Sequence, residues 1–491
     1  MEKNHNFKSF IKIMSHNFFR SSHSGLVAFL ITNVIAVFLT PFILNHITKS
    51  EYGFYILCID LGAWMGFLQF GTSKTLGPMV SMNLKDSKII NDLFNSAFWF
   101  QLIISIIAVP LVYLLINYSM SADNSVINKN SYMLIFSISI FFTIMLSILK
   151  EMIIASKKIY INNYSNIILQ LMHAILIIVF LPKSNMRGIF LIYFTFSIFQ
   201  FLYFFSIMRR HFPELRIKLK YFSYKIFKTM TSNGLFFTAS SIGSIMIFKY
   251  DKVFLSKNIG LEYVAKLLIS IKLYILGEKI VSLIYNNIRP YISEYYGSND
   301  IFKLKDINQI IHYSLYFLSS FIFWFIIVIN ESFVRMWVGD EYFIGQEISI
   351  LFGMFFYFNS LTLGNRIVLV STLSYVKFTN ITFLALGILR VVYLEFFVSV
   401  NDIHLVAFSN ILIVIIFGSF IQFALVIRLY NISFNINEIV IILAPSILLL
   451  SFISDYIFLI NYLFPLVIMI VIISGYNSSI YTKINNYIKS Y

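Results

Sequence analysis

Long apolar runs separated by short polar stretches follow one another along almost the whole chain. A helix needs roughly 20 apolar residues to cross the hydrocarbon of a bilayer, so each run of this length predicts one transmembrane helix. We therefore expect an all-α integral membrane protein of about 14 helices. The runs cover residues 24–45, 53–73, 92–117, 132–150, 160–181, 187–208, 230–250, 262–287, 310–330, 346–370, 379–398, 403–427, 438–454 and 456–475.

The same pattern occurs twice, about 211 residues apart. Glu51-Tyr52 and Glu262-Tyr263 are offset by 211 residues, and Pro78 and Pro290 by 212. In each copy an apolar span leads through a short polar elbow to a second apolar span that ends near the Pro. A duplicated helical half in an apolar chain is typical of transporters whose halves move about a site between them.

The repeat also predicts the domain organisation. We expect an N-terminal lobe over residues 1–212, a basic linker over 213–229, a C-terminal lobe over 230–427, and two further helices with a C-terminal tail over 428–491. The cations around the linker suit a segment that lies along an anionic membrane surface. A stop-transfer charge cluster explains them equally well. They are Arg209, Arg210, Arg216, Lys218, Lys220, Lys225 and Lys228.

Composition and charge agree with a membrane protein. Hydrophobic residues make up 59% of the chain and charged residues 12%, whereas soluble domains carry about 25% charged residues. With the N-terminus inside, 24 of the 37 Lys and Arg fall in inner segments and 7 in outer loops. This bias predicts that both termini are cytoplasmic. The net charge of +15 then reflects topology, so we expect no nucleic-acid partner.

Several function classes lack their sequence signals. The single cysteine, Cys58, excludes an internal disulfide and a cysteine metal cluster. No phosphate-cradling Gly-rich loop, catalytic triad or zinc motif is present. The longest connection has about twenty residues, which leaves no room for a soluble catalytic domain. We therefore predict no enzyme, no cofactor and no metal, and an H⁺ or Na⁺ gradient as the possible energy source.

Cations deep in the spans predict the substrate cavity. An ionisable side chain at a helix centre costs at least about 2.5 to 3.5 kcal/mol unless it faces a cavity or a partner. Lys272 lies roughly 15 Å into its span and Arg390 roughly 17 Å. We expect both to line a cavity, joined by Lys266, Lys279 and Arg366. The alternative is a buried ion pair with Glu395, Glu278 or another carboxylate.

Four further ionisable residues are candidates for ion coupling. Asp60 lies about 10 Å into the second span and His173 about 20 Å into the fifth. Asp251 and Glu278 lie nearer the ends of their spans. Each has an alternative role: a buried hydrogen-bonded His for His173, a helix-packing Asp for Asp60, and an interfacial anchor or a local ion pair for Asp251 and Glu278.

Short motifs in a fixed order resemble a known family. The chain is similar to the Wzx-type polysaccharide (O-antigen or capsule) repeat-unit flippases of the multidrug/oligosaccharidyl-lipid/polysaccharide (MOP) exporter superfamily. The resemblance covers nearly the whole chain. It rests on Gly25, Pro41-Phe42, Glu51-Tyr52-Gly53, Phe70-Gly71, Lys74, Asp251, Gly260, Tyr263, Pro290, Asp300, Trp337-Val338-Gly339 and Tyr342, and on the loops Ala155-Ser156-Lys157-Lys158 and Ser374-Tyr375-Val376-Lys377.

The resemblance implies two six-helix lobes related by a parallel repeat, two extra C-terminal helices and a central cavity. It also implies transfer of an undecaprenyl-diphosphate-linked oligosaccharide from the cytoplasmic to the outer leaflet of a bacterial inner membrane, in lipopolysaccharide biosynthesis. Membrane lipids, a polysaccharide polymerase and chain-length proteins would be its partners. Relatives often end the second span with Asp-Phe-Gly, whereas this chain has Gln69-Phe70-Gly71.

Three other functions stay open. A cation-coupled drug exporter of the same superfamily should have an anionic cavity, whereas the spans of the second half carry more Lys and Arg than Asp and Glu. A lipid II flippase would use similar chemistry and would be told apart by whether loss of the gene is lethal. A membrane polysaccharide polymerase or ligase, an enzyme, should show a long external loop.

Overall fold

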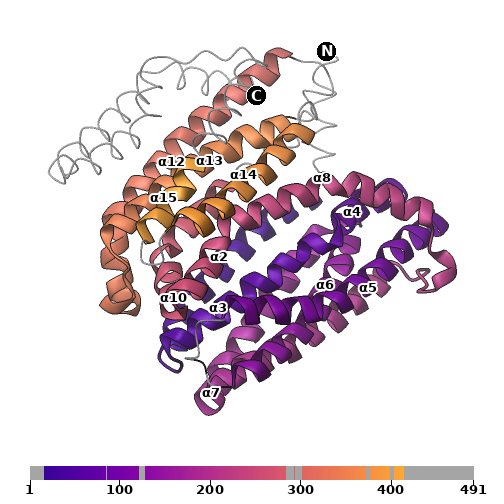
Figure 1. Ribbon diagram of the computed structural model, residues 1–491. Helices are drawn as coiled ribbons and strands as arrows, with labels where there is room; N and C mark the ends of the chain where they lie inside the picture. Colours follow the sequence, from indigo (N-terminus) through magenta and orange to yellow (C-terminus); the bar gives the residue numbers. More distant parts are fainter. Residues whose placement is uncertain are drawn as a thin grey trace. The chain divides into compact units, whose positions relative to one another are not determined.

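Every regular element that the structure describes is helical (Figure 1). The computed structural model describes residues 16–84, 86–120, 128–156, 158–282, 301–371, 376–398 and 403–413, with Val126 and Ile292. Within these ranges six helices are long and apolar enough to cross a membrane, or seven if one bent pair is a single span. The prediction of an all-helical protein with several spans is therefore confirmed for the described residues. The predicted spans 438–454 and 456–475 lie outside them.

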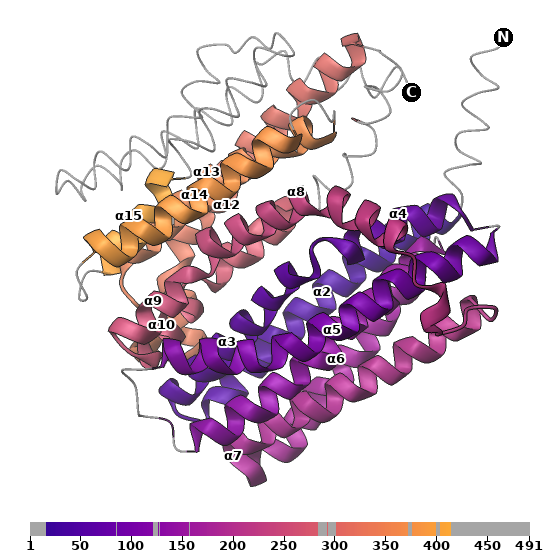
Figure 2. The ribbon, with the colours of Figure 1, turned by 45° about the vertical axis from the view of Figure 1, so that its right-hand side comes forward.

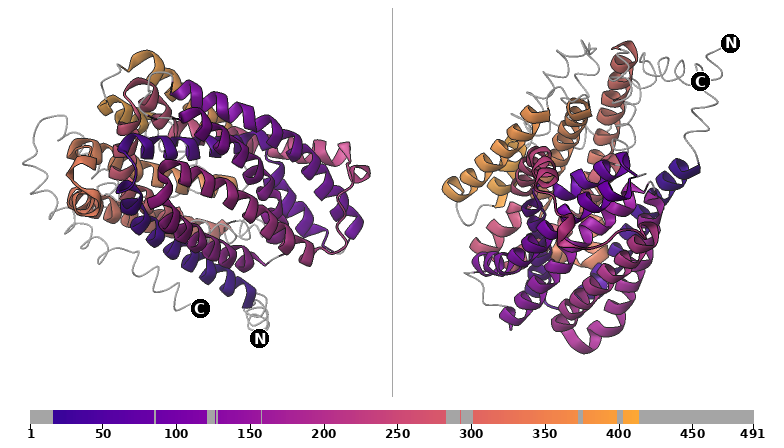
Figure 3. Two further views of the ribbon diagram at one scale, coloured as in Figure 1. Left: turned by 90° about the horizontal axis from the view of Figure 1, so that it is seen from below. Right: turned by 90° about the vertical axis from the view of Figure 1, so that its right-hand side faces the viewer.

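The first six predicted spans correspond to a set of long helices that pack side by side (Figure 2). One helix, α7, contains both the fifth and the sixth span. Its two arms meet at Asn185, whose backbone is non-helical (φ 49°, ψ −148°), and the chain reverses there (Figure 3). The elements are α2 His16–Leu44, α3 Lys49–Trp64, η1 Met65–Gln69, α4 Thr72–Met82, α5 Ser87–Ser119, α6 Lys129–Ala155, α7 Ile159–His211 and η2 Leu219–Tyr221.

The second half contains shorter pieces of helix at its start and long helices afterwards. Helix breaks lie at Lys249, at the end of the predicted seventh span, and at Ile271, within the predicted eighth span. Helix α13 packs against α12, α14 and α15. The elements are α8 Tyr224–Phe248, α9 Tyr250–Asn258, α10 Leu261–Ser270, helical residues 272–282, α12 Ile301–Val338, η3 Asp340–Tyr342, α13 Gln346–Ser371, α14 Val376–Phe397 and α15 Ile403–Ile413.

The second predicted span is broken at Phe70-Gly71. Both residues have left-handed backbone conformations (φ 46° and 68°), and the helices on either side are bent by 57°. Left-handed backbone is easy for glycine and costly for most other residues. A Cβ atom on Gly71 would lie 2.6 Å from the backbone of Gly234. The glycine pair therefore lets the bend and helix α8 approach each other closely.

The chain forms two compact units. The N-unit comprises residues 1–242 and 252–265, and the C-unit comprises residues 243–251 and those from Lys266 onward. The predicted lobe boundaries stay a prediction, and the linker predicted at 213–229 lies within the N-unit. The reason lies in the packing, because Leu215 of this linker and Met230 of α8 are buried in the core of the N-unit with Phe94, Met152 and Phe204.

The two copies of the repeated elbow adopt corresponding positions. Glu51 lies in the first turn of α3, and Glu262 lies in the first turn of α10. Glu51 and Thr48 form a capping box, in which each side chain accepts a hydrogen bond from the other's backbone N–H. Negative side chains in a first turn also complement the helix dipole. The repeat seen in sequence is therefore a repeat of local structure.

We expect that Gly53→Ala destabilises the N-unit. A Cβ atom on Gly53 would lie 2.0 Å from the carbonyl oxygen of Leu261, and backbone cannot move aside as a flexible side chain can. Overpacking of this kind costs about 1 to 3 kcal/mol or more. The measurement is the thermal unfolding of the purified protein. Gly66→Ala is the matched control, since no atom lies within 4 Å of its added Cβ; equal unfolding of the two variants would contradict the close approach.

Candidate functional site

Arg390 on α14 is the centre of a buried polar cluster in the C-unit. The residue is 0% exposed. Its guanidinium donates hydrogen bonds to the carbonyl oxygens of Met246 (3.0 Å) and Ile247 (2.7 Å), and it forms an ion pair with the carboxylate of Asp251 on α9. The second oxygen of that carboxylate accepts a hydrogen bond from Asn410 on α15 at 3.1 Å. Four helices therefore meet at one charge pair.

Local helix geometry explains why an arginine lies here. Helix α8 ends at Phe248, so its last carbonyl groups lack helical partners and carry the negative end of the helix dipole. Two glycines permit the contact with α14. A Cβ on Gly243 would lie 2.4 Å from the carbonyl oxygen of Phe383, and a Cβ on Gly387 would lie 2.9 Å from the carbonyl oxygen of Gly243. Small residues of this kind let helices approach closely in membranes.

This cluster changes the interpretation of two predicted site residues. We expected Arg390 to line a cavity, with a buried ion pair as the alternative, and the structure shows the ion pair. Its partner is Asp251 rather than Glu395 or Glu278, the carboxylates named from sequence. Glu395 instead accepts a hydrogen bond from the hydroxyl of Tyr250. The carboxylate of Asp251, a predicted ion-coupling residue, forms an ion pair with Arg390 and accepts a hydrogen bond from Asn410.

The predicted cavity lysines lie along one part of the C-unit. Lys266 on α10 and Lys272 are half-buried, and Lys279 is exposed. Lys272 and Lys279 lie on the continuous helical stretch 272–282, where a spacing of seven places them on one face. Arg366 lies on α13, but its side chain is outside the described residues. The structure therefore keeps the three lysines in the same unit as the buried pair.

Glu278 is hydrogen-bonded to an amide. It lies on the same helical stretch as Lys272 and accepts a hydrogen bond from Asn359 on α13 at 2.9 Å. Among the described residues it forms no ion pair, although Lys279 is its neighbour in the chain. Its environment thus differs from that of the paired Asp251.

In the N-unit, Asp60 on α3 forms an ion pair with Lys252 on α9. Both side chains are nearly buried, with 13% and 11% exposure. Asp60 was predicted as an ion-coupling or helix-packing residue, and Lys252 had no predicted role. His173, the other candidate in this unit, packs against the ring of Phe196 with the ring centres 4.9 Å apart.

The segment 252–265 is held in the N-unit at several further points. Lys49 and Glu262 approach to 3.7 Å. Lys257 donates to the hydroxyl of Tyr118 at 2.9 Å, and Ser256 donates to the carbonyl oxygen of Ser119 at 3.1 Å. One of the three boundaries between the units along the chain thus falls between Asp251 and Lys252, since Asp251 pairs within the C-unit and Lys252 pairs within the N-unit.

Sequence reasoning missed the neutral polar clusters. Gln69, Ser73, Gln101 and Ser147 join η1, α4, α5 and α6 through hydrogen bonds of up to 3.2 Å. Gln69 belongs to this cluster, which contains amides and hydroxyls and no carboxylate. In the C-unit, Asn330 donates to the carbonyl oxygen of Ser270 at 2.9 Å, where α10 ends. Such residues are common in apolar spans, and nothing in a single sequence pairs them.

The described residues contain no group of three or more His, Cys, Asp or Glu side chains that could hold a metal ion. Among their buried charged side chains, Arg390 pairs with Asp251 and Lys252 pairs with Asp60.

Comparisons with known proteins identify the fold. No protein-family model matches the chain, and no curated protein matches it. Among solved structures, the lipid II flippase MurJ in an inward closed conformation matches with a TM-score of 0.68 and 16% identity, over 93% of this chain and 98% of that one. An inward-facing multidrug resistance MATE family transporter of the MOP superfamily matches with a TM-score of 0.63 and 13% identity, over 83% and 96%.

A third match concerns binding-pocket charge. A MOP superfamily transporter from Pyrococcus furiosus, described as having a binding pocket of reversed polarity that suggests a different function, matches with a TM-score of 0.59 and 12% identity, over 84% and 96% of the two chains. These neighbours are transporters and flippases, not enzymes. The chain therefore has the MOP transporter fold, which confirms the superfamily resemblance at the level of fold. The Wzx branch stays a prediction.

We expect Arg390→Ala to destabilise the C-unit strongly, because it leaves Asp251 as a buried carboxylate without its cation. Breaking a buried pair costs about 3 to 5 kcal/mol. Asp251→Ala should destabilise similarly, and the double variant should lose less than the sum of the two. The measurement is a double-mutant cycle of unfolding free energies in detergent. Additive effects would contradict the pair.

Proposed function

We propose that this protein is a flippase that moves a diphosphate-linked oligosaccharide on a prenyl lipid from the cytoplasmic to the outer leaflet of the inner membrane. The observation that carries the proposal is the placement of Lys266, Lys272 and Lys279 in the C-unit of a protein with the MOP transporter fold. A cationic side chain that lines a water-filled cavity can bind a phosphate through strong charge-assisted hydrogen bonds.

The mechanism follows from the two units. Lys272 and Lys279, on one helix face, would hold the diphosphate, with Lys266 and Arg366 close along the same unit. The prenyl tail would stay in lipid. Movement of the N-unit relative to the C-unit would then carry the head group across by alternating access. Arg390 is bound to Asp251 in the present conformation, so it would contact the substrate only in a conformation that separates this pair.

The carboxylates of the described spans argue against a cation-coupled drug exporter. An organic cation needs a carboxylate to bind, but Asp60 is paired with Lys252 and Asp251 with Arg390. Glu395 accepts a hydrogen bond from Tyr250. These three carboxylates are thus engaged within the protein.

The two remaining alternatives differ from the proposal in cargo or chemistry. A lipid II flippase would also bind a diphosphate, and the fold is shared with MurJ. Its deletion would be lethal, whereas loss of a surface-polysaccharide flippase would remove the glycan from a living cell. A polymerase would form glycosidic bonds, and the structural neighbours reported above are not enzymes.

Glu278 is the residue we favour for proton coupling. A coupling carboxylate has to exist in charged and neutral forms during the cycle. Protonation of Asp60 or Asp251 would leave Lys252 or Arg390 buried without a counter-charge, which is costly. Glu278 instead accepts a hydrogen bond from the Asn359 amide, so its protonation leaves no such charge. His173, packed on Phe196, lacks a comparable polar partner among the described residues.

We predict that Lys272→Gln with Lys279→Gln abolishes surface polysaccharide. A hydrogen bond to a charged group contributes about 1.5 to 3 kcal/mol, so losing two should lower flipping by at least about tenfold, since 1.4 kcal/mol is a factor of ten. The readout is surface glycan and accumulated lipid-linked oligosaccharide in a deletion strain that carries each variant.

The matched control is Lys272→Arg with Lys279→Arg, which keeps both charges and should restore display. Membrane levels of each variant are measured by immunoblot. Normal glycan display in the Gln double variant would remove the lysines from the substrate site. Resistance to organic cations conferred by the wild type would favour the drug exporter.

We predict that Glu278→Gln uncouples transport from the proton gradient. The variant keeps a polar side chain beside Asn359 but cannot release a proton. In reconstituted vesicles, an imposed pH gradient should accelerate flipping by the wild type and leave the variant unchanged. Glu347→Gln serves as control because Glu347 is exposed. A variant that still responds to the gradient would assign coupling to another group.

A further inference from the structure

The basic linker between α7 and α8 is a fixed structural element of the N-unit. Residues 212–223 contain a turn at 213–214 and one turn of 3-10 helix at Leu219–Tyr221, and the backbone at Lys218 and Phe222 is extended. Arg209 at the end of α7 donates to the carbonyl oxygen of Leu215. A linker that only stops translocation needs its charges and no defined backbone, so its packing points to a further role.

Three buried side chains of α5 hold the linker backbone. Asn91 accepts from the N–H of Arg216 at 2.7 Å. Asn95 accepts from the N–H of Lys218 at 2.9 Å and donates to the carbonyl oxygen of Arg216 at 2.8 Å. Ser96 accepts from the N–H of Ser223 at 2.9 Å. Asn91, Asn95 and Ser96 lie on one face of α5. We call these three side chains the pins of the linker, because their hydrogen bonds fix its backbone.

The pins fix which linker side chains face outward. In extended backbone, successive side chains point to opposite sides. Leu215 and Ile217 pack onto the core of the N-unit, whereas Arg216, Lys218 and Lys220 are exposed. Among the described residues, none of these three cations forms an ion pair. The linker therefore presents three cations in a defined row.

Apolar side chains stand exposed beside these cations. Leu219 is 66% exposed and Tyr224 is 69% exposed, and Phe222 is also exposed. Exposure of neighbouring apolar side chains to water is unfavourable. Their exposure here therefore indicates a surface that contacts an apolar environment. A surface that is both cationic and apolar matches a bilayer interface, where phosphates and hydrocarbon lie within one layer.

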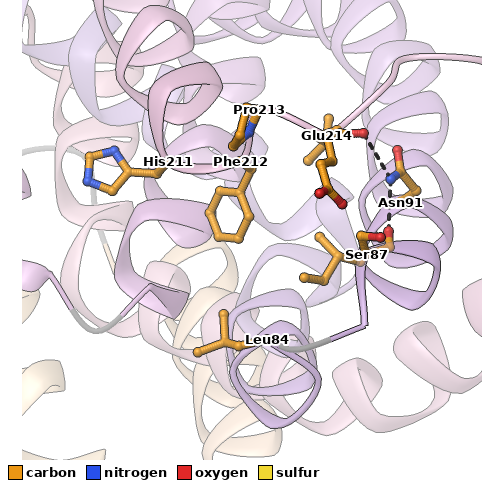
Figure 4. A pocket seen from close by; sticks show the side chains of 9 residues that line it. Leu84, Ser87, Asn91, His211, Phe212, Pro213 and Glu214 are labelled. Atoms are coloured by element: carbon orange, nitrogen blue, oxygen red, sulfur yellow. Dashed lines mark hydrogen bonds between the residues drawn. The ribbon is translucent and has the colours of Figure 1, made fainter.

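A neighbouring pocket does not take the phosphate. This pocket of about 420 Å³ lies between the start of α5 and the end of α7, and Figure 4 shows Ser87, Asn91, His211, Phe212 and Glu214 around it. None of its lining residues is Lys or Arg, and Glu214 contributes a carboxylate. Asn91 is engaged with backbone, as the dashed lines in Figure 4 show. An anion therefore suits the row of cations and not the pocket.

We infer that the pinned linker is a docking surface for anionic phospholipid head groups of the adjoining leaflet. Arg216, Lys218 and Lys220 bind the phosphates, and Leu219, Phe222 and Tyr224 enter the interface between them. The surface fastens the N-unit to the membrane plane. An acidic peptide would match the cations but would leave the exposed Leu219 without a partner. This role is independent of the cargo and adds to the transport function.

The test measures the environment of the linker with a dye attached to it. Leu219→Cys in a Cys58→Ala background carries an environment-sensitive NBD dye, and the full chain is reconstituted in nanodiscs of phosphatidylcholine alone or with phosphatidylglycerol. We expect a blue shift of the dye and lower collisional quenching by iodide when phosphatidylglycerol is present. High salt should reduce both changes, because exposed charges are screened.

Three variants distinguish binding of phospholipid by this defined row of cations from attraction by the net charge of the protein. Neutralising the row with R216Q, K218Q and K220Q should abolish the response. The matched control K88Q, K158Q and K183Q removes three exposed cations elsewhere in the N-unit and should keep most of it. Asn95→Ala keeps every charge but removes the pins to Arg216 and Lys218, and it should lower the response.

Two results would overturn the inference. One is a dye signal that is equal in both lipid compositions, which would leave a protein partner or solvent as the neighbour of the linker. The other is an equal loss in the two triple variants, which would show attraction by net charge alone. If Asn95→Ala fails to fold, the comparison of the two triple variants still decides the question.

Discussion

Burying a charge in an apolar bundle requires a counter-charge, and this constraint organises the described structure. Asp251 and Lys252 are consecutive and opposite in charge, and each is met by a partner in its own unit: Arg390 for Asp251 and Asp60 for Lys252. A buried ion pair adds little net stability, but its disruption is expensive. The main effect of the two pairs is therefore to assign Asp251 to the C-unit and Lys252 to the N-unit. Their contribution to the stability of the protein is small.

The same constraint separates structural charges from functional ones. Arg390 looked like a cavity residue by depth, yet it closes the end of α8 and neutralises Asp251. Lys272 and Lys279 share one helix face at a spacing of seven. In the proposed function they bind the diphosphate, in addition to the contacts that they make within the protein.

Much of the fold could be predicted from sequence, because a bilayer fixes the length of an apolar helix. The spans, the repeated Glu-Tyr elbow and the reversal between residues 181 and 187 all follow from the apolar runs and polar breaks along the sequence. The contacts between side chains could not be predicted in this way. Depth along a helix says how far Arg390 lies from the surface, but not that α8 presents its carbonyls there. Likewise, Asn91, Asn95 and Ser96 read as ordinary polar residues until the linker backbone is seen against them.

The most direct measurement is flipping by the purified protein in vesicles with two synthetic cargoes that carry the same glycan. One cargo has a prenyl diphosphate, and the other has an uncharged diacylglycerol in its place. If the cationic stretch of the C-unit recognises the diphosphate, only the first cargo should reach the opposite leaflet at a rate above that of empty vesicles. Equal transport of both cargoes, or transport of neither while organic cations are moved, would contradict the account.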